Sequence, residues 1–157
     1  MTNNGSGAGA ESGDSRRVVF HHDKLKMKLD VVLPADEVLI APTVKRIMEA
    51  VSEIDCSKGK EFEIETALLE ALANAVRHGA KGDATKKVEC VVACEEPLGM
   101  LIIVRDPGEG FDPKSVPNPT QGDAIFNDHG RGIYMINQLM DEVKFEKNGT
   151  EIHMRKF

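Results

Sequence analysis

The order of strand-like and helical segments is the feature of this sequence that most limits the folds open to it. Alternation of apolar and polar residues with period two predicts strands, and apolar residues at i, i+3, i+4 and i+7 predict helices. These patterns predict a strand over residues 16–33, helices over 42–54 and 61–77, and strands over 86–94 and 100–105. A long loop over 106–132 follows, and then a helix over 133–140 and strands over 143–146 and 151–156. Because the helices and the neighbouring strands are partly segregated along the chain, we expect an α+β fold with two layers rather than a doubly wound parallel sheet.

The turn signals agree with this order. Pro34 ends the first strand, Gly79 ends the second helix, and Asn148-Gly149 predicts a tight hairpin between the last two strands. The loop over residues 106–132 is rich in glycine and proline, and a loop of this length inside a compact domain is usually functional or mobile.

The length of the chain fits one domain with a tail. With 157 residues the chain can bury a real core without needing a disulfide or a structural metal. Residues 1–15 consist mainly of Gly, Ser, Asn and Ala and offer little to bury, so we expect a disordered tail. The folded domain is then expected over residues 16–157.

The composition argues against several classes of partner. The net charge is −6 and the pI about 5.4, and an acidic surface repels nucleic acid and anionic membranes. No apolar run approaches the roughly 18 residues of a membrane span, and the N-terminus lacks the apolar stretch of a signal peptide. The cysteines, Cys56, Cys90 and Cys94, lack metal-type spacing, so we expect reduced thiols in a cytoplasmic protein.

The second predicted helix carries the first segment with candidate chemistry. At about 100° per residue, Glu70, Asn74 and Arg77 fall on one stripe beside the apolar face of this helix. An amide oxygen can bind Mg²⁺, and a carboxylate can accept a proton from an attacking hydroxyl or water. The alternative is a solvated polar pair one turn apart on a surface helix.

The second segment follows the strand over residues 100–105. Asp106 at a strand end can accept a hydrogen bond from an exocyclic amine such as that of adenine. Gly108 and Gly110 let the backbone approach a flat ring or adopt positive φ, and Phe111 follows them. The alternative is an ordinary turn, because Asp-Pro-Gly favours turns in any case.

The third segment precedes the last predicted helix. Gly130 and Gly132 lie at its expected N-terminus, where free N–H groups and the helix dipole suit a phosphate group. Arg131 between them can add charge-assisted hydrogen bonds. The alternative is a flexible linker, and neither the P-loop nor the Gly-x-Gly-x-x-Gly fingerprint is present in the sequence.

Taken together and in this order, the three segments resemble the ATP-binding boxes of the GHKL superfamily of ATPases, which includes DNA gyrase, the heat-shock chaperone and histidine-kinase ATP domains. The similarity is greatest to its small branch of bacterial anti-sigma regulatory factors that are serine/threonine protein kinases. The sequence EALANAVRHG at 70–79 resembles the first box, DPGEGFDP at 106–113 the second, and GRGIYMI at 130–136 the third. Gly149-Thr150 is also similar, and the resemblance covers about residues 25–157.

The resemblance implies a Bergerat-type ATP-binding fold, a two-layer α/β sandwich with a mixed, mainly antiparallel sheet. It implies ATP and Mg²⁺ as cofactors, with Glu70 as catalytic base, Asn74 as Mg²⁺ ligand and Asp106 as acceptor for the adenine amine. It also implies an ATP lid over residues 112–129. The remaining nucleotide-binding positions would be Arg77, His78, Gly108, Gly110, Phe111, Gly130, Arg131, Gly132 and Thr150.

For function, the resemblance implies a cytoplasmic anti-sigma factor that phosphorylates a Ser or Thr of an anti-anti-sigma (antagonist) protein and sequesters a sigma factor. A homodimer is expected, with no direct nucleic-acid or membrane partner. Two alternatives stay open: a nucleotide-binding partner-switch module without kinase activity, and an isolated sensor-kinase ATP-binding domain. A complete sensor kinase is disfavoured, because residues 1–60 offer one good helix and it contains no His.

Overall fold

The computed structural model describes residues 23–112, 114 and 128–157. The predicted tail, the first part of the strand expected at 16–33 and most of the expected lid lie outside the described residues. The sheet, three helices and the cavity between them are formed by residues within the described ranges.

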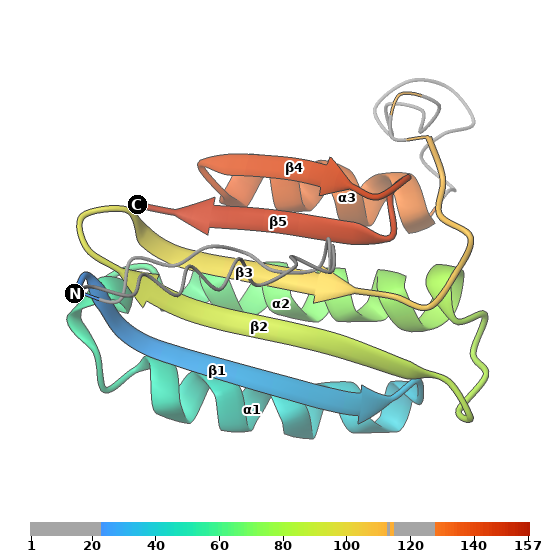
Figure 1. Ribbon diagram of the computed structural model, residues 1–157, viewed down its shortest axis with the longest axis horizontal. Coiled ribbons are helices and arrows are strands. Elements are labelled where there is room, and N and C mark those ends of the chain that lie inside the picture. The colour runs from blue at the N-terminus through green and yellow to red at the C-terminus, as the bar shows by residue number, and fades with distance from the viewer. Residues whose placement is uncertain (1–22, 113, 115–127) are drawn as a thin grey trace, which may run out of the picture.

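A five-stranded sheet forms one layer of the structure (Figure 1). The strands lie side by side in the order β1-β2-β3-β5-β4, and each of the four pairings is antiparallel. Their bounds are Leu25–Pro34 for β1, Lys87–Glu95 for β2, Gly99–Arg105 for β3, Glu142–Glu146 for β4 and Glu151–Lys156 for β5. The prediction of an α+β fold is therefore confirmed, and the described sheet is wholly antiparallel.

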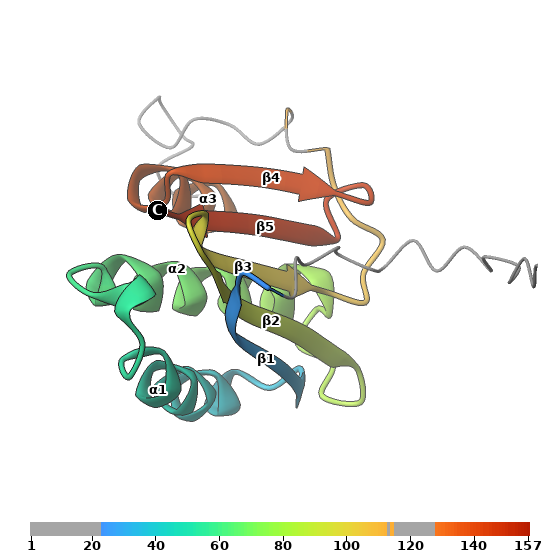
Figure 2. The same ribbon diagram turned by 60° about the vertical axis from the view of Figure 1, so that its left-hand side comes forward.

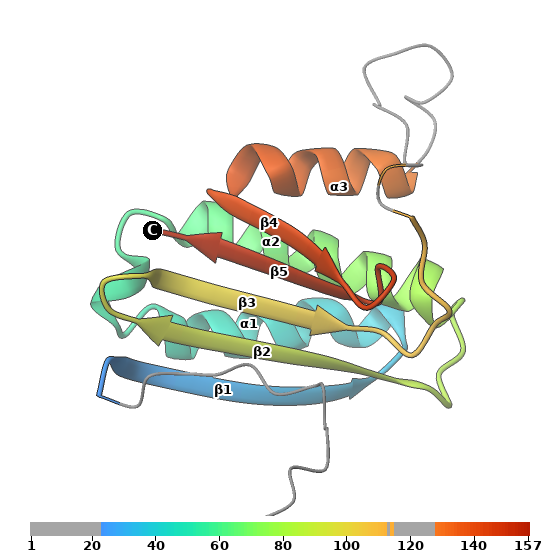
Figure 3. The same ribbon diagram turned by 45° about the horizontal axis from the view of Figure 1, so that its top comes forward.

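Three helices form the second layer, all on the same side of the sheet (Figures 1 and 2). Helix α2 packs between α1 and α3, and α3 lies beside the β4–β5 end of the sheet (Figure 3). The bounds are Ile40–Val51 for α1, Glu61–Asn74 for α2 and Asp128–Leu139 for α3. Short turns η1, η2 and η3 cover Glu37–Leu39, Asp55–Ser57 and Ala75–Gly79.

The main core fills the space between the sheet and the helices. It takes alternate residues of the strands, as the period-two pattern requires, and the apolar stripes of the helices. Its largest fully buried members are Ile64, Leu68, Leu72, Met100, Ile102, Ile136 and Met154. None of the described helices has the length and apolar character needed to cross a membrane.

Several helix boundaries differ from the sequence prediction. The first helix, predicted over residues 42–54, spans Ile40–Val51. The sequence pattern predicts that the second helix continues to Arg77, but regular α-helix ends at Asn74 and a π turn occupies Ala75–Gly79. The last helix begins at Asp128 rather than at Ile133, so the glycines expected before the helix lie in its first turns. Glycine weakens the helical signal, which is why the pattern alone places the start too late.

The hairpin predicted from Asn148-Gly149 is present. Lys147, Asn148 and Gly149 all have positive φ, at 50°, 58° and 81°. Asn and Gly tolerate this left-handed region far better than most residues. The turn fixes the register of β4 on β5 and brings the hairpin to the edge of the cavity.

The expectation of reduced thiols is wrong for two of the three cysteines. Cys56 in η2 and Cys94 in β2 form a disulfide, with their Cα atoms 6.1 Å apart. The two residues are 38 positions apart, so only the fold brings them together and local spacing gives no signal. Cys90 is free, and burial raises the pKa of its thiol to about 12.

Candidate functional site

A cavity of about 510 Å³ opens between the end of α2, the π turn, the end of β3 and the β4–β5 hairpin. Its walls come from segments far apart in the sequence. The residues predicted from sequence that line it are Asn74, His78, Asp106, Gly108, Gly110, Phe111 and Thr150. Its volume lies within the range that small-molecule ligands occupy in proteins.

Through the π turn, the end of α2 lies in close contact with the end of β3, next to Asp106. Ala80 N–H donates to the carbonyl of Ala75 at 2.8 Å, five residues back, which widens the turn by one residue. A Cβ atom on Gly79 would lie 2.3 Å from Cγ of Asp106, and one on Gly108 would lie 2.4 Å from the carbonyl oxygen of Gly79. Only glycine permits this contact at both positions.

Asp106 lies half-buried in the lining of the cavity. Its Oδ1 accepts the N–H of Gly108 at 2.8 Å, and its own N–H donates to the carbonyl of Thr150 at 2.9 Å. Burial raises the pKa of this carboxyl above its usual value, and the Gly108 hydrogen bond opposes part of that rise. With Oδ1 engaged, the second carboxylate oxygen is the acceptor available to a ligand amine.

The segment after Asp106 is fixed to the β4–β5 hairpin. Gly110 has φ +85°, and a Cβ there would lie 1.9 Å from the carbonyl oxygen of Asn148. Phe111 donates its N–H to the same oxygen at 2.7 Å and packs edge-on against Phe145, with ring centroids 5.3 Å apart. The hairpin and the second box therefore form one wall of the cavity.

At the other end of the site, Glu70 and Asn74 converge on the first turns of α3. A Cβ on Gly132 would lie 2.9 Å from Oε2 of Glu70 and 3.2 Å from Nδ2 of Asn74. The pair one turn apart on α2 thus faces the glycine of the third box across the helix contact. The α2 and α3 helices pack together along this line.

The other predicted residues occupy different places. Arg77 does not line the cavity, and it pairs with Glu37 of η1. Glu70, Gly130, Arg131 and Gly132 do not line the cavity itself, although Glu70 and Gly132 adjoin Asn74 at its edge. His78 lines the cavity but is exposed.

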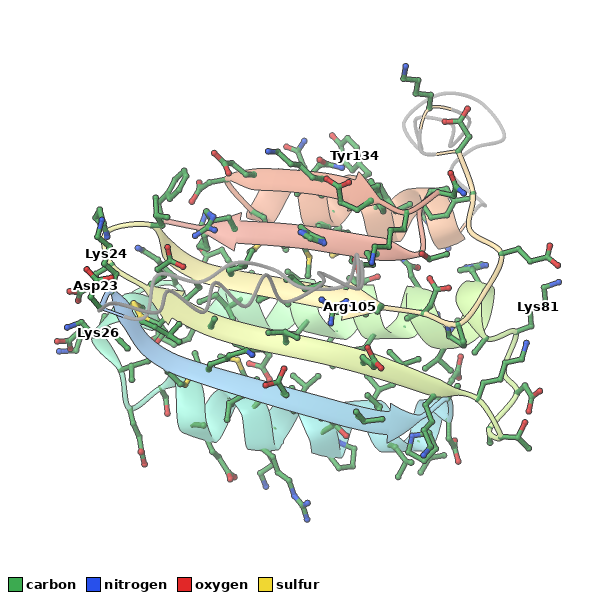
Figure 4. All side chains as sticks on the ribbon, viewed as in Figure 1. Asp23, Lys24, Lys26, Lys81, Arg105 and Tyr134 are labelled. Carbon is green, nitrogen blue, oxygen red and sulfur yellow. A yellow bond between two sulfur atoms is a disulfide. The ribbon has the colours of Figure 1, made fainter. Side chains whose placement is uncertain are left out.

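Sequence reasoning misses part of the wall. It assigns Gly79 only to helix termination, although this glycine contacts Asp106 directly. Lys81 and Lys86 add two cations to the lining, and Lys81 projects from the loop after the π turn (Figure 4). Phe145 and Ile152 supply apolar surface from β4 and β5. Period-two alternation marks these last two as inward-facing but does not place them at a cavity.

A network of charges supports the site from the opposite face of the sheet, where Arg105 lies (Figure 4). Nε of Arg105 donates to Oε1 of the buried Glu151 at 2.8 Å, and Lys147 and His153 lie 3.5 and 3.4 Å from the same carboxylate. Arg105 and Glu151 are partners in the β3–β5 register, directly before Asp106 and after Thr150. The network therefore holds together the two strand ends that carry the site residues.

The Glu151→Gln variant should lose stability in a pH-dependent way. Burial alone raises the pKa of Glu151, but the hydrogen bond and charge of Arg105, with His153 and Lys147, outweigh it and leave the pKa lowered. Because the pKa of Glu151 is lower in the folded state, its ionised carboxylate stabilises the folded protein at pH values above the unfolded-state pKa of about 4.3. This stabilisation is lost as the pH falls through the folded-state pKa. We expect a loss of about 1–3 kcal/mol at pH 7 in urea unfolding, shrinking below about pH 4.

The control for this variant is Glu142→Gln, which changes an exposed carboxylate of β4. It should leave the unfolding free energy nearly unchanged at both pH values. An equal loss for Glu151→Gln at pH 7 and at pH 3 would show that the charge of Glu151 is not what stabilises this face.

The donor set of the site fits a nucleotide with its metal. Asp106 offers an acceptor at one end, glycine backbone lies close by, and Asn74 offers an amide oxygen at the other end. Within the described residues no group of three or more His, Cys, Asp or Glu side chains converges as a metal site. A divalent cation here would thus take most of its ligands from phosphate oxygens and water, which is usual for Mg²⁺.

Comparisons with known proteins agree with this geometry. Residues 33–156 match the family model described as the histidine kinase-like ATPase domain. Proteins named anti-sigma F factor from Bacillus thuringiensis (strain Al Hakam) and Bacillus mycoides (strain KBAB4) are each 33% identical over 113 residues. In both cases the match covers 68% of this chain and 76% of the relative.

Proposed function

The chain belongs to the histidine kinase-like ATPase domain family, in its anti-sigma factor branch, and from this we propose that it is an ATP-dependent protein serine/threonine kinase acting as an anti-sigma factor. The observation that carries the proposal is the convergence of three separate segments on one cavity. Asp106 and the nearby glycines line one end, while Asn74, Glu70 and Gly132 meet at the other.

Each residue has a distinct part in the proposed reaction. Asp106 accepts a hydrogen bond from the exocyclic amine of adenine, with Thr150 beside it, and Gly79 and Gly108 let the backbone lie against Asp106. Asn74 would hold Mg²⁺, and the ion would supply positive charge beside the nucleotide phosphates. Glu70 accepts the proton of the attacking Ser or Thr hydroxyl, whose high pKa makes such a base useful.

The partners follow from the branch to which the chain belongs. The relatives are named for a sigma factor, so we propose a sigma factor as the sequestered partner and an anti-anti-sigma protein as the phosphorylated substrate. A homodimer and a cytoplasmic location belong to the same proposal. The location rests on the sigma-factor partner, because the disulfide removes the argument from reduced thiols.

Phosphate transfer from ATP is the direct test. The full chain is incubated with Mg²⁺, labelled ATP and a candidate anti-anti-sigma protein, and labelled phosphoprotein is measured together with complex formation. Phosphoserine or phosphothreonine on the antagonist supports the kinase. Nucleotide-dependent complex formation without phosphoprotein supports the partner-switch module without kinase activity.

The Gly132→Ala variant should separate catalysis from folding. The added Cβ would lie 2.9 Å from Oε2 of Glu70, the far end of a flexible side chain, so Glu70 can move at small cost to stability. That movement displaces the proposed base, and we expect the transfer rate to fall by about 10-fold or more. Stopped-flow or quench-flow transfer assays measure it, with urea unfolding as the check on stability.

The matched control for this variant is Gly82→Ser. Gly82 has no atom within 4 Å of an added Cβ but has φ +70°, so substitution there strains a surface loop without touching the site. It should lower stability and leave the transfer rate unchanged. Unchanged transfer in Gly132→Ala would instead place the base somewhere other than beside Gly132.

A further inference from the structure

The disulfide between Cys56 and Cys94 joins the helical layer to the sheet. Cys56 lies in η2, the turn that connects α1 with α2, and Cys94 lies near the end of β2. The two positions are 38 residues apart, and the segment that they enclose contains all of α2 and the π turn. The bond therefore closes a loop around the residues of the first box, among them Glu70 and Asn74.

The two sulfur atoms of this bond differ in how readily a reagent can reach them. Cys94 is 1% exposed and belongs to the main core. Cys56 is only partly buried, and its neighbours Asp55 and Lys58 are exposed and pair with each other at 2.9 Å. Disulfide exchange begins when a thiolate attacks one sulfur atom, and the rate depends on access to that atom. Cys56 is therefore the sulfur at which exchange with an external thiol begins.

The position of η2 does not depend on the disulfide alone. Ser57, next to Cys56, is fully buried, and its hydroxyl donates to the carbonyl of Val51 at 2.8 Å or to that of Ile54 at 3.0 Å. The turn also contacts β3. These contacts would keep Cys56 beside Cys94 when both are thiols, so the same fold can carry either the disulfide or the dithiol.

The third cysteine does not compete for this pairing. Cys90 precedes Cys94 by four residues on the core face of β2, which places the two roughly 13 Å apart along the strand. Bridged cysteines have Cα atoms less than about 7 Å apart. Burial also raises the pKa of the Cys90 thiol to about 12, so almost none of it is the reactive thiolate at neutral pH. Exchange within one chain is therefore confined to Cys56 and Cys94.

A disulfide in the cytoplasm differs in role from one in a secreted protein. The proposed sigma-factor partner places the chain in the cytoplasm, where disulfides are usually transient, catalytic or redox-sensing. This step rests on the proposed function. We propose that Cys56 and Cys94 form a reversible thiol–disulfide site whose redox state sets how firmly the first box is held. Its oxidant is a small-molecule disulfide such as oxidised glutathione, and its reductant is a thiol or dithiol.

The oxidation proceeds in two exchange steps. The Cys56 thiolate attacks one sulfur of oxidised glutathione, which forms a mixed disulfide and releases one glutathione thiolate. The Cys94 thiolate then attacks Sγ of Cys56, which forms the protein disulfide and releases the second glutathione thiolate. The two protons lost by the cysteines are taken up by the two released thiolates. Two electrons thus pass from the protein to glutathione, and reduction by a dithiol reverses both steps.

The disulfide should restrain the loop that carries the first box. A cross-link stabilises mainly by limiting the unfolded chain, and it does so more strongly when the enclosed loop is long, as it is here. Because α2 and the π turn lie inside this loop, their local opening should be rarer in the oxidised protein. We expect reduction to lower the urea midpoint by about 1–2 M. Hydrogen exchange of the α2 amides should become several-fold faster.

Thiol labelling of the full-length chain tests the proposal. The natural protein is equilibrated in glutathione buffers from fully reduced to strongly oxidised, trapped with acid, and labelled under denaturing conditions with a maleimide that adds mass. With three cysteines in the sequence and two of them in the disulfide, the number of labels should move reversibly between three and one. Urea unfolding of the same samples should show the higher midpoint only in the oxidised protein.

Two variants separate the pair from the free cysteine. Cys56→Ser should have the midpoint of the reduced natural protein in every buffer. Cys90→Ser is the control and should keep a midpoint that depends on the buffer. Cys94→Ala provides a second variant if Cys56→Ser unfolds, with circular dichroism as the check on folding.

Three results would overturn the proposal. Three labels in every buffer would mean that the bond does not form, and one label in every buffer would mean that it is permanent. Equal urea midpoints for the oxidised and the reduced protein would mean that the pair does not restrain the first box. None of these measurements uses ATP or an antagonist protein, so failure of this proposal is distinct from failure of the proposed kinase.

Discussion

Replacing Glu70 by glutamine should abolish phosphate transfer to the antagonist protein while leaving ATP binding in place. Glutamine keeps the size of the side chain and its approach to Gly132, but it cannot accept the proton of the attacking hydroxyl. Loss of a general base typically lowers a rate by about 10²–10⁴-fold. Single-turnover transfer assays at saturating ATP measure this loss without a contribution from nucleotide affinity.

Glu65→Gln is the matched control for this variant. Glu65 lies on the same helix, is exposed and has no part in the cavity. The control should transfer phosphate at the natural rate. If Glu70→Gln also transfers phosphate at the natural rate, Glu70 is not the base. That result would not bear on the nucleotide site around Asp106, which is tested separately by ATP binding to the Asp106 variant.

The sequence predicts the architecture well where local physics decides it. Asn148-Gly149 specifies the hairpin because both residues accept positive φ, and the strand over residues 151–156 is found with the same bounds. The alternation of apolar and charged residues in β1 predicts that Met27, Leu29 and Val31 face the core, and they do. For such segments the local preference and the tertiary structure agree, so the prediction holds.

The sequence is a poorer guide where contacts between distant segments decide the structure. A helical pattern runs past Asn74, but the contact of Gly79 with Asp106 belongs to a π turn that helical periodicity does not encode. Arg77 shares a helical stripe with Glu70 on an ideal wheel, yet it pairs with Glu37 outside the cavity. The π turn changes the angular position of residues after Asn74, so the ideal wheel no longer applies.

Asp106→Asn should weaken ATP binding by about 10- to 100-fold, the loss expected when a charged hydrogen-bond partner is replaced. The asparagine oxygen can still accept the N–H of Gly108, as Oδ1 of Asp106 does at 2.8 Å. The other polar group of the asparagine side chain is then an NH₂ group, which can only donate. It faces the adenine amine, also a donor, at the place where the carboxylate oxygen of Asp106 accepted a hydrogen bond. Calorimetric titration with ATP and with GTP should show loss of adenine preference.

The same variant should be at least as stable as the natural protein without nucleotide. Burial raises the pKa of Asp106 in the folded state. The contribution of this carboxyl to the stability of the folded protein is therefore fully present below its unfolded-state pKa and is lost as the pH rises through its folded-state pKa. At neutral pH the ionised carboxylate therefore costs stability, and asparagine removes the cost. The midpoint of thermal unfolding should be higher for the variant at pH 7, with the difference vanishing below about pH 4.

A carboxylate that binds a ligand is distinguished from a structural one by the two effects of its replacement: ATP binding becomes weaker while the stability of the protein without nucleotide stays the same or rises. A structural Asp106 would lose stability on replacement and change affinity only through misfolding. Asp30→Asn is the control, since its exposed carboxylate lies on β1, pairs with Lys28 and does not line the cavity. Unchanged ATP affinity in Asp106→Asn, with unfolding as in the natural protein, would remove Asp106 from the adenine site and with it the anchor of the proposed nucleotide orientation.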